Sequence, residues 1–432
     1  MKKFVTQNEA VKLIENLGKE FTVIKNPDYV YPEYEVIPLS EKLKSVNDIK
    51  ALVMDMDGTT TTTEELCLHS LEYMIRRMSG LYSKENWIGL DHEKDFPNVI
   101  GNSTTKHVEY LISTYQELLN GKDIFKSFLD SAKWTMKFGK DQKRSEEVKL
   151  NLKQFGLNDL TDNPEKQFDY KNQFDHLNKT DLVRIGIDIY YQRYHLILQR
   201  IMNGESSNVS SELFNDPNKH LIEPMQGIAV FLSLCKGLLG DEADLLIEIL
   251  LEHHLTKAGK EFEGNLDSAK SNLKKLGLYF QKSPLKIAVV TSSIYYEADI
   301  VLSEVFKVLS ESVNNFPITE SRKQKIRYAF SDYKNFYDSV VTASDSSEIR
   351  LKPHRDLYSI ALHQLNIPKD QFNQVVGFED SESGTIAIRA AGVGLCCAVP
   401  FAQTSGHNLE AASHICLGGI PEVLLNHNLF LK

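Results

Sequence analysis

Two aspartates separated by one residue follow an apolar run, in the segment Asp55-Met56-Asp57-Gly58-Thr59. Side chains two positions apart in an extended chain point to the same side, so both carboxylates can reach one ligand. One carboxylate, Asp55, can attack phosphorus and form an aspartyl phosphate. The other, Asp57, can protonate the leaving oxygen and later deprotonate water, which requires a pKa above the value of about 3.9 of a free aspartate. Taken alone, the same residues also suit a plain turn.

A second polar segment, Thr291-Ser292-Ser293, follows the apolar run 287–290. Hydroxyl and backbone N–H groups at a strand-to-helix turn are suited to hold a phosphate group. We predict Thr291 and Ser292 as phosphate-binding residues. The alternative is that these residues only cap the helix that follows, because Ser and Thr are preferred at that position.

A lysine followed by proline, Lys352-Pro353, forms the third segment. A fixed ammonium group beside a transferred phosphoryl group stabilises its negative charge. We predict Lys352 as a phosphate-binding residue and place Pro353 in the first turn of a helix, where proline is favoured. The alternative is a solvated surface lysine, which is the most common environment of this residue type.

Two adjacent acidic residues, Glu379 and Asp380, end a further apolar run and begin the segment that reaches Gly384. Adjacent buried carboxylates are costly without a cation, and Mg²⁺ prefers carboxylate oxygens together with water and substrate phosphate. We therefore predict a Mg²⁺ site with Asp380 as the first ligand and Glu379 as the second. The alternative is an acidic first turn that complements a helix dipole.

Each of these segments lies at or beside the end of a predicted strand. Apolar, β-prone runs at 49–54, 285–290, 339–342, 374–378 and 394–399 alternate with helical patterns, and 415–417 is a candidate last strand. Repeated strand–helix–strand units predict an α/β fold of the Rossmann-like type, with a parallel sheet between layers of helices. Ligands bind at the carboxyl ends of such strands. The four segments should therefore meet at one edge of the sheet.

The strand-forming parts of the chain are separated by a long segment with helical periodicity. Its clearest helix is expected at 181–202, and the run 224–234 is expected to mark the return to the sheet. We predict an N-terminal extension at 1–48, a catalytic core at 49–63 and 281–432, and a mostly α-helical cap domain at 64–280. Residues 21–39 combine three prolines with β-forming residues and predict irregular or edge-strand structure.

The four segments, read as DMDGT, VVTSS, RLKP and GFEDSESG, together resemble the haloacid dehalogenase superfamily. The resemblance covers 49–63 and 284–400 and is greatest to the branch of β-phosphoglucomutase and sugar-phosphate phosphatases. It implies that Asp55 is the nucleophile and a metal ligand, and that Asp57 is the acid/base and binds the metal through its backbone oxygen. It also implies that Asp380 holds Mg²⁺. The second aspartate is typical of the phosphatases and mutases of this superfamily rather than its dehalogenases.

The sequence departs from that branch in two places. The run Thr59 to Thr63 lacks the aspartate that often follows the first motif. Cys67 occupies the position of a histidine found in β-phosphoglucomutases, although His69 is two residues further on. We therefore predict a Mg²⁺-dependent phosphatase that acts on a phosphorylated small metabolite, with a phosphomutase and a non-catalytic phosphometabolite-binding protein as the alternatives. The long helical segment leaves the substrate open.

The composition is that of an ordinary globular protein. The 432 residues carry 49 Lys and Arg against 59 Asp and Glu, a net charge of -10, which argues against a nucleic-acid partner. No run has the length of a membrane helix, and the start has no apolar signal region. The five cysteines match neither a disulfide framework nor a paired zinc pattern, so we expect a reduced, cytoplasmic monomer or homodimer. The five are Cys67, Cys235, Cys396, Cys397 and Cys416.

Overall fold

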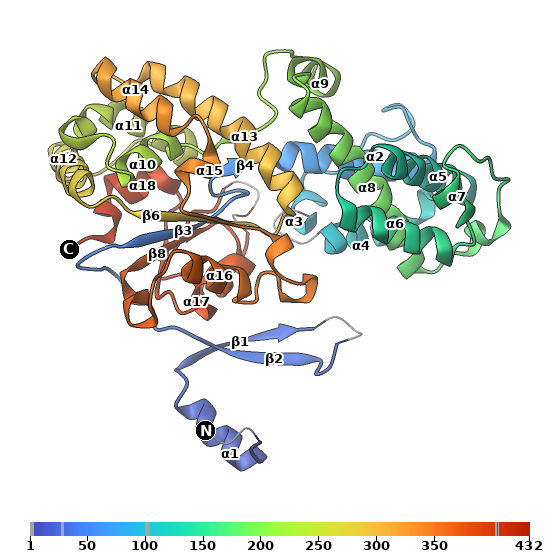
Figure 1. Ribbon diagram of the computed structural model, residues 1–432, viewed down its shortest axis with the longest axis horizontal. Coiled ribbons are helices and arrows are strands. Elements are labelled where there is room, and N and C mark those ends of the chain that lie inside the picture. Colours follow the sequence, from blue (N-terminus) through green and yellow to red (C-terminus); the bar gives the residue numbers. More distant parts are fainter. Residues whose placement is uncertain (1–3, 27–29, 100–103, 402–403, 405) are drawn as a thin grey trace. The chain divides into compact units, whose positions relative to one another are not determined.

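The computed structural model describes residues 4–26, 30–99, 104–401, 404 and 406–432 (Figure 1). The chain divides into two compact units. The sheet unit comprises Met1–Thr62 and Ile222–Lys432, and the helical unit comprises Thr63–Leu221. None of the described helices is long and apolar enough to cross a membrane.

A six-stranded sheet forms the centre of the sheet unit, with every neighbouring pair parallel and the order β10-β9-β8-β3-β6-β7. Its central strand, β3, is buried at all five positions, as its continuous apolar sequence predicts. This sheet confirms the predicted α/β fold. The strands are β3 (Ala51–Asp55), β6 (Lys286–Val290), β7 (Ser339–Val341), β8 (Val375–Glu379), β9 (Leu395–Ala398) and β10 (His414–Ile415).

Helices cover both faces of this sheet, with α16 and α17 below it and α10, α13 and α18 above it in the view of Figure 1. On the α16 side, Leu357 and Tyr358 share one core with strand residues such as Val53. On the other side, Phe231 of α10 packs edge-on against Phe378 of β8, with ring centroids 5.3 Å apart. The helices of this unit are α10 (Ile228–Cys235), α11 (Ile247–Ala258), α12 (Leu266–Lys282), α13 (Tyr295–Ser312), α14 (Glu320–Ala329), α15 (Tyr333–Phe336), α16 (Asp356–Gln364), α17 (Glu382–Ala390) and α18 (Gly419–Leu425).

The N-terminal segment belongs to the sheet unit. It forms helix α1 (Gln7–Glu15) and an antiparallel pair of strands, β1 (Glu20–Lys25) and β2 (Tyr34–Leu39). Ile24 and Ile37 of this pair pack against Ala390 at the end of α17. Both strands of a two-stranded sheet are edge strands, which agrees with the edge-strand alternative predicted for this segment.

The helical unit is built around one long helix, α8 (Lys179–Met202), which matches the helix predicted at 181–202. It packs against α2, α4 and α5. Gly186 permits the close approach, because a Cβ atom there would lie 2.8 Å from Val108 and 3.0 Å from Met74. The other helices are α2 (Glu64–Ser79), α3 (Phe96–Val99), α4 (Thr104–Thr114), α5 (Gly121–Phe138), α6 (Gln142–Gln154), α7 (Asp159–Asp162) and α9 (Ser206–Phe214).

The boundary between the units differs from the predicted cap at 64–280. The helical unit ends at Leu221, and the segment 222–280 packs with the sheet. Two short strands, β4 (Thr61–Thr62) and β5 (Glu223–Pro224), pair where the chain leaves and re-enters the sheet unit, close to the return expected at 224–234. The physical reason is the apolar surface of α10, whose eight residues are all buried. A 3-10 turn, Gly240–Leu246, leads into α11.

Candidate active site

The loop that follows β3 is held by its own backbone and threonine side chains. Met56 O accepts hydrogen bonds from the backbone N–H groups of Thr60 and Thr61, at 2.9 and 2.8 Å. The Thr60 hydroxyl donates to Asp55 O at 2.6 Å. The threonine run therefore closes a tight turn that fixes the backbone around the two aspartates.

Gly58 lets this loop approach the acidic pair at the end of β8. Its φ is +83°, a conformation that favours glycine. A Cβ atom at this position would lie 2.6 Å from Asp380 Oδ2 and 2.7 Å from the Phe401 ring. The first and fourth sequence segments are therefore in direct contact, although more than 300 positions separate them.

The hydroxyl segment after β6 contacts Asp57. The hydroxyls of Thr291 and Ser293 each donate to Asp57 Oδ2 at 3.3 Å, and the Ser293 N–H donates to Thr291 Oγ1 at 2.9 Å. Thr291 is buried, whereas Ser292, the predicted second phosphate-binding residue, is exposed. The structure thus places Ser293 rather than Ser292 beside the aspartates, because the turn after β6 directs the side chain of Ser292 to solvent.

Lys352 lies at the centre of the cluster. Its Nζ donates to Asp55 Oδ1, to Glu379 Oε1 at 2.7 Å and to the backbone oxygen of Val290 at 3.2 Å. The side chain is only 6% exposed, so the solvated-lysine alternative is wrong. Burial opposes its charge, but the carboxylates of Asp55 and Glu379 outweigh burial and hold the pKa of Lys352 above its usual value. Lys352 is therefore a fixed positive charge beside Asp55.

The proline after Lys352 lies outside the helix in which we had placed it. Helix α16 begins at Asp356, so Pro353 precedes its first turn. The backbone around Lys352 is a loop, and the side-chain contacts of Lys352 rather than a helix cap fix its position.

Glu379 uses both carboxylate oxygens in hydrogen bonds. Besides Lys352, its Oε1 accepts from the Tyr358 hydroxyl at 3.0 Å. Its Oε2 accepts from the backbone N–H groups of Asp380 and Ser381, at 3.1 and 3.2 Å, and from the Ser381 hydroxyl at 2.9 Å. Gly384 is required here, because a Cβ atom would lie 1.8 Å from the Glu379 carboxylate. Glu379 thus positions Lys352 and the turn after β8.

Three buried carboxylates converge around this lysine. Asp55, Glu379 and Asp380 each offer an oxygen, and these oxygens all lie within 4.8 Å of one another. Asp55 Oδ2 is buried and has no hydrogen-bond partner among the described residues. Burial, followed by the charge of Glu379, raises the pKa of Asp55 well above its usual value. An unpartnered buried oxygen beside further carboxylates is the donor set that a hard divalent cation such as Mg²⁺ takes.

Two residues of this site carried no recognised signal in the sequence. The sequence carries no signal for the role of Tyr358, because a tyrosine on an apolar helix face is ordinarily a core residue. Ser381 lay within a quoted segment without a role; it caps α17 by accepting from the Gly384 N–H at 3.2 Å. The segment Glu379-Asp380-Ser381 followed by glycine was the available signal for Ser381.

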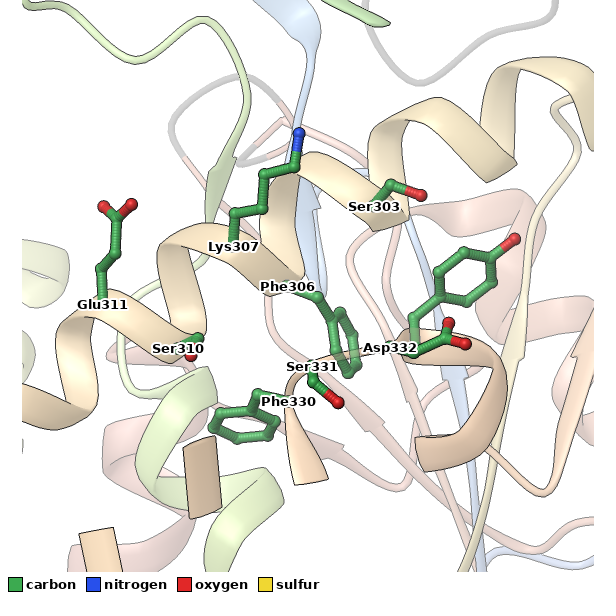
Figure 2. A pocket seen from close by; sticks show the side chains of 9 residues that line it. Ser303, Phe306, Lys307, Ser310, Glu311, Phe330, Ser331 and Asp332 are labelled. Atoms are coloured by element: carbon green, nitrogen blue, oxygen red, sulfur yellow. The ribbon is translucent and has the colours of Figure 1, made fainter. Parts of the chain in front are cut away.

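A separate hollow of about 400 Å³ lies over α13 and the turn before α15 (Figure 2). The buried rings of Phe306 and Phe330 line it together with polar residues such as Lys307 and Asp332. Asp332 already caps α15 by accepting from the Lys334 N–H at 2.9 Å. This hollow shares no residue with the Asp55 cluster and brings no set of reactive groups together.

No protein-family model matches the chain, and no curated protein matches its sequence. Among solved structures, it is similar to CbbY from Rhodobacter sphaeroides in complex with phosphate, at 14% identity and a TM-score of 0.43, over 89% of this chain and 100% of the other. It is also similar to β-phosphoglucomutase from Clostridium difficile, at 14% identity and a TM-score of 0.34, over 85% and 90% of the two chains. A hydrolase from Pseudomonas syringae shares 12% identity at a TM-score of 0.37, over 89% and 100%.

Proposed function

We propose that this protein is a Mg²⁺-dependent phosphatase of the haloacid dehalogenase type, which hydrolyses a phosphorylated small molecule through an aspartyl phosphate. The observation that carries the proposal is the position of Lys352, whose ammonium group contacts both Asp55 and Glu379 in a buried cluster. A fixed cation beside an aspartate with an unpartnered oxygen is the arrangement that anionic phosphoryl chemistry requires.

Asp55 is the nucleophile in this proposal. One of its carboxylate oxygens forms a bond to phosphorus while the bond between phosphorus and the ester oxygen breaks. Asp57 gives its proton to the departing alcohol. Water then attacks the aspartyl phosphate and returns a proton to Asp57, the bond between Asp55 and phosphorus breaks, and phosphate leaves.

The neighbours of these aspartates support the assigned roles. Thr291 and Ser293 hold the Asp57 carboxylate from one side, so the acid has a fixed direction. Lys352 would bind the phosphate oxygens together with the hydroxyl of Thr291. Charge stabilisation of this kind is usually the largest single contribution to such catalysis.

Mg²⁺ would be held by Asp55 and Asp380, with the backbone oxygen of Asp57 as a further ligand. Glu379 completes the carboxylate cluster but already accepts hydrogen bonds at both oxygens. When bound, the ion supplies neutralisation of the phosphate charge and orientation of the group. The unpartnered Asp55 Oδ2 is the feature of this chain that fits such an ion.

The test is release of inorganic phosphate from sugar phosphates, nucleotides and p-nitrophenyl phosphate, with Mg²⁺ present or removed by EDTA. Asp55→Asn should lower turnover at least about a thousandfold, because the amide cannot act as the nucleophile. Asp370→Asn is the matched control, since Asp370 is exposed in the same unit. Circular dichroism checks that both variants fold.

Three outcomes would contradict this proposal. Retained turnover in Asp55→Asn would rule out Asp55 as the nucleophile. Activity that EDTA does not reduce would rule out a requirement for Mg²⁺. Transfer of the phosphoryl group between hydroxyls without phosphate release would favour a phosphomutase instead.

A further inference from the structure

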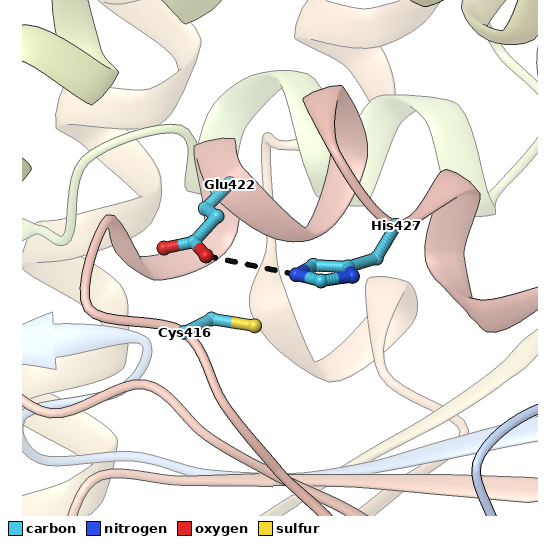
Figure 3. Close-up of side chains that lie close together, drawn as sticks. All are labelled: Cys416, Glu422 and His427. Carbon is cyan, nitrogen blue, oxygen red and sulfur yellow. Dashed lines mark ion pairs between the residues drawn. The ribbon is translucent and has the colours of Figure 1, made fainter. Parts of the chain in front are cut away.

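A second cluster of potential metal ligands lies beside β10, the edge strand at the other end of the six-stranded sheet from β7. Cys416 follows the edge strand β10, Glu422 belongs to α18, and His427 comes directly after that helix. Figure 3 shows the thiol, the carboxylate and the imidazole pointing toward one another. One ligand atom from each lies within 4.8 Å of the other two. Strands β9 and β8 separate β10 from β3, which carries Asp55.

A second thiol lies beside the thiol of this cluster. The Cys397 thiol, on strand β9, donates to the sulphur of Cys416 at 3.6 Å. Both cysteines are fully buried and neither forms a disulfide. The cluster itself combines a cysteine, a histidine and a carboxylate, which are the ligand types of zinc sites.

The spacing of the imidazole and the carboxylate agrees with two ligands of one ion. Bond lengths of about 2.1 Å from zinc to nitrogen or oxygen place neighbouring ligand atoms about 3.4 Å apart. His427 Nε2 is 3.6 Å from Glu422 Oε1, which is farther than the partners of a strong hydrogen bond between these atoms. Cys397 is not among the residues whose ligand atoms all lie within 4.8 Å of one another, so its thiol is a neighbour of the Cys416 thiol rather than a ligand.

The surrounding structure holds the ligands in place without an ion. Glu422 Oε2 accepts from the Gly418 N–H at 2.6 Å, which leaves Oε1 directed at His427. The Cys416 N–H donates to Ala398 O at 2.8 Å, and the His427 ring stacks on Phe430 with centroids 5.5 Å apart. The side chains of Glu422 and His427 are 20% and 34% exposed, so an ion can enter from that side.

We propose that Cys416, Glu422 and His427 bind one zinc-type divalent cation, which joins the sheet edge to the C-terminal helix. The Cys416 thiol loses its proton to solvent on binding, so the site takes the ion as a thiolate. Thiolate ligands select zinc over Mg²⁺, and the site is therefore chemically distinct from the Asp55 cluster. The alternative is that no ion binds and that hydrogen bonds alone link the thiol, the imidazole and the carboxylate.

The experiment is zinc titration of the reduced, chelator-treated full chain against a chromophoric competitor. Wild-type protein should bind one zinc per chain, and Co²⁺ in its place should give a thiolate charge-transfer band. Cys416→Ser and His427→Gln should each weaken zinc binding about 100-fold or more, since each removes a ligand. His427→Gln is the variant least able to disturb folding, because His427 is partly exposed.

The matched controls are Cys396→Ser and His363→Gln. Cys396 is equally buried but directs its thiol to Thr385 O, and His363 is exposed on α16. Both should bind zinc as wild type does. The proposal is overturned if wild-type protein binds no zinc, or if His427→Gln and Cys416→Ser bind it as tightly as the controls. Because no substrate is involved, the result is independent of the proposed phosphatase activity.

Discussion

At the scale of single residues, the site depends on one buried cation between two buried carboxylates. Burying a charge lowers stability unless opposite charges or hydrogen bonds close to it offset the loss of water. Lys352 has three such partners, Asp55, Glu379 and the Val290 carbonyl, and Tyr358 supports Glu379. The charge of Lys352 therefore serves stability and the proposed chemistry together.

Lys352→Met should remove the charge while keeping much of the side-chain volume. We expect a loss of about 3–5 kcal/mol in the free energy of unfolding, because two carboxylates then face each other without a cation. Chemical denaturation at neutral pH measures this loss. Lys369→Met, at an exposed position, is the control and should leave stability unchanged.

The loss in Lys352→Met should depend on pH. Burial raises the pKa of Asp55, and without the lysine this pKa rises further. A carboxyl pKa that is raised on folding leaves the free energy of unfolding unchanged at pH values below the unfolded pKa of about 3.9. Above that pH it lowers the free energy of unfolding progressively, until the pH passes the folded pKa. The difference from wild type should therefore shrink as the pH falls toward 4. A difference that stays constant with pH would contradict this account.

At the scale of elements, two glycines allow close packing in the loop after β3 and the turn after β8. Gly58 faces Asp380, and Gly384 faces Glu379, each at a distance that excludes a Cβ atom. The loop after β3 can therefore approach Asp380 only because Gly58 has no side chain, and the turn after β8 can hold the Glu379 carboxylate only because Gly384 has none.

Gly58→Ala should reduce activity and Mg²⁺ affinity by at least about tenfold, because the methyl group displaces Asp380. Gly204→Ala is a close control. Gly204 has a φ of +82°, almost that of Gly58, but nothing lies within 4 Å of its Cβ position. Both variants should lose about 1 kcal/mol of stability from backbone strain. Equal activity in the two would show that contact with Asp380 is unimportant.

At the scale of the whole molecule, the chain divides into two compact units. In the helical unit, Phe128 is fully buried and packs against Phe155 and Phe174. In the sheet unit, the core under α16 joins residues of several strands. Compact units with their own cores can open independently of each other.

Phe128→Ala should lower the stability of the helical unit by about 3–5 kcal/mol, because it removes a fully buried ring. Hydrogen exchange followed by mass spectrometry should show faster exchange in 63–221 and little change in the six-stranded sheet. Phe138→Ala is the control, since Phe138 is 48% exposed. Faster exchange throughout both units would mean that they unfold as one.

The sequence by itself determined the α/β class, the strands of the sheet within one or two residues, and the residue types at the ends of β3, β6 and β8. Apolar runs and helical periodicity are local, so strand and helix positions follow from them. The sequence predicts that Asp55, Lys352 and Glu379 meet, because the carboxyl ends of parallel strands lie at one edge of the sheet. The structure places the three side chains in contact. Their catalytic roles stay predictions.

Only the tertiary structure decided the features that depend on distant contacts. The structure showed that Ser293 contacts Asp57, because the direction of a side chain in a turn is set by the backbone around it. Phosphate binding by Ser292 stays a prediction. The structure ends the helical unit at Leu221, whereas the sequence predicted an end at 280, because a helix belongs to the core it packs against. The structure also brought Cys416 together with Glu422 and His427, although the spacing of the cysteines matches no zinc pattern. Residues after a strand, within a helix and after that helix meet only in the folded chain.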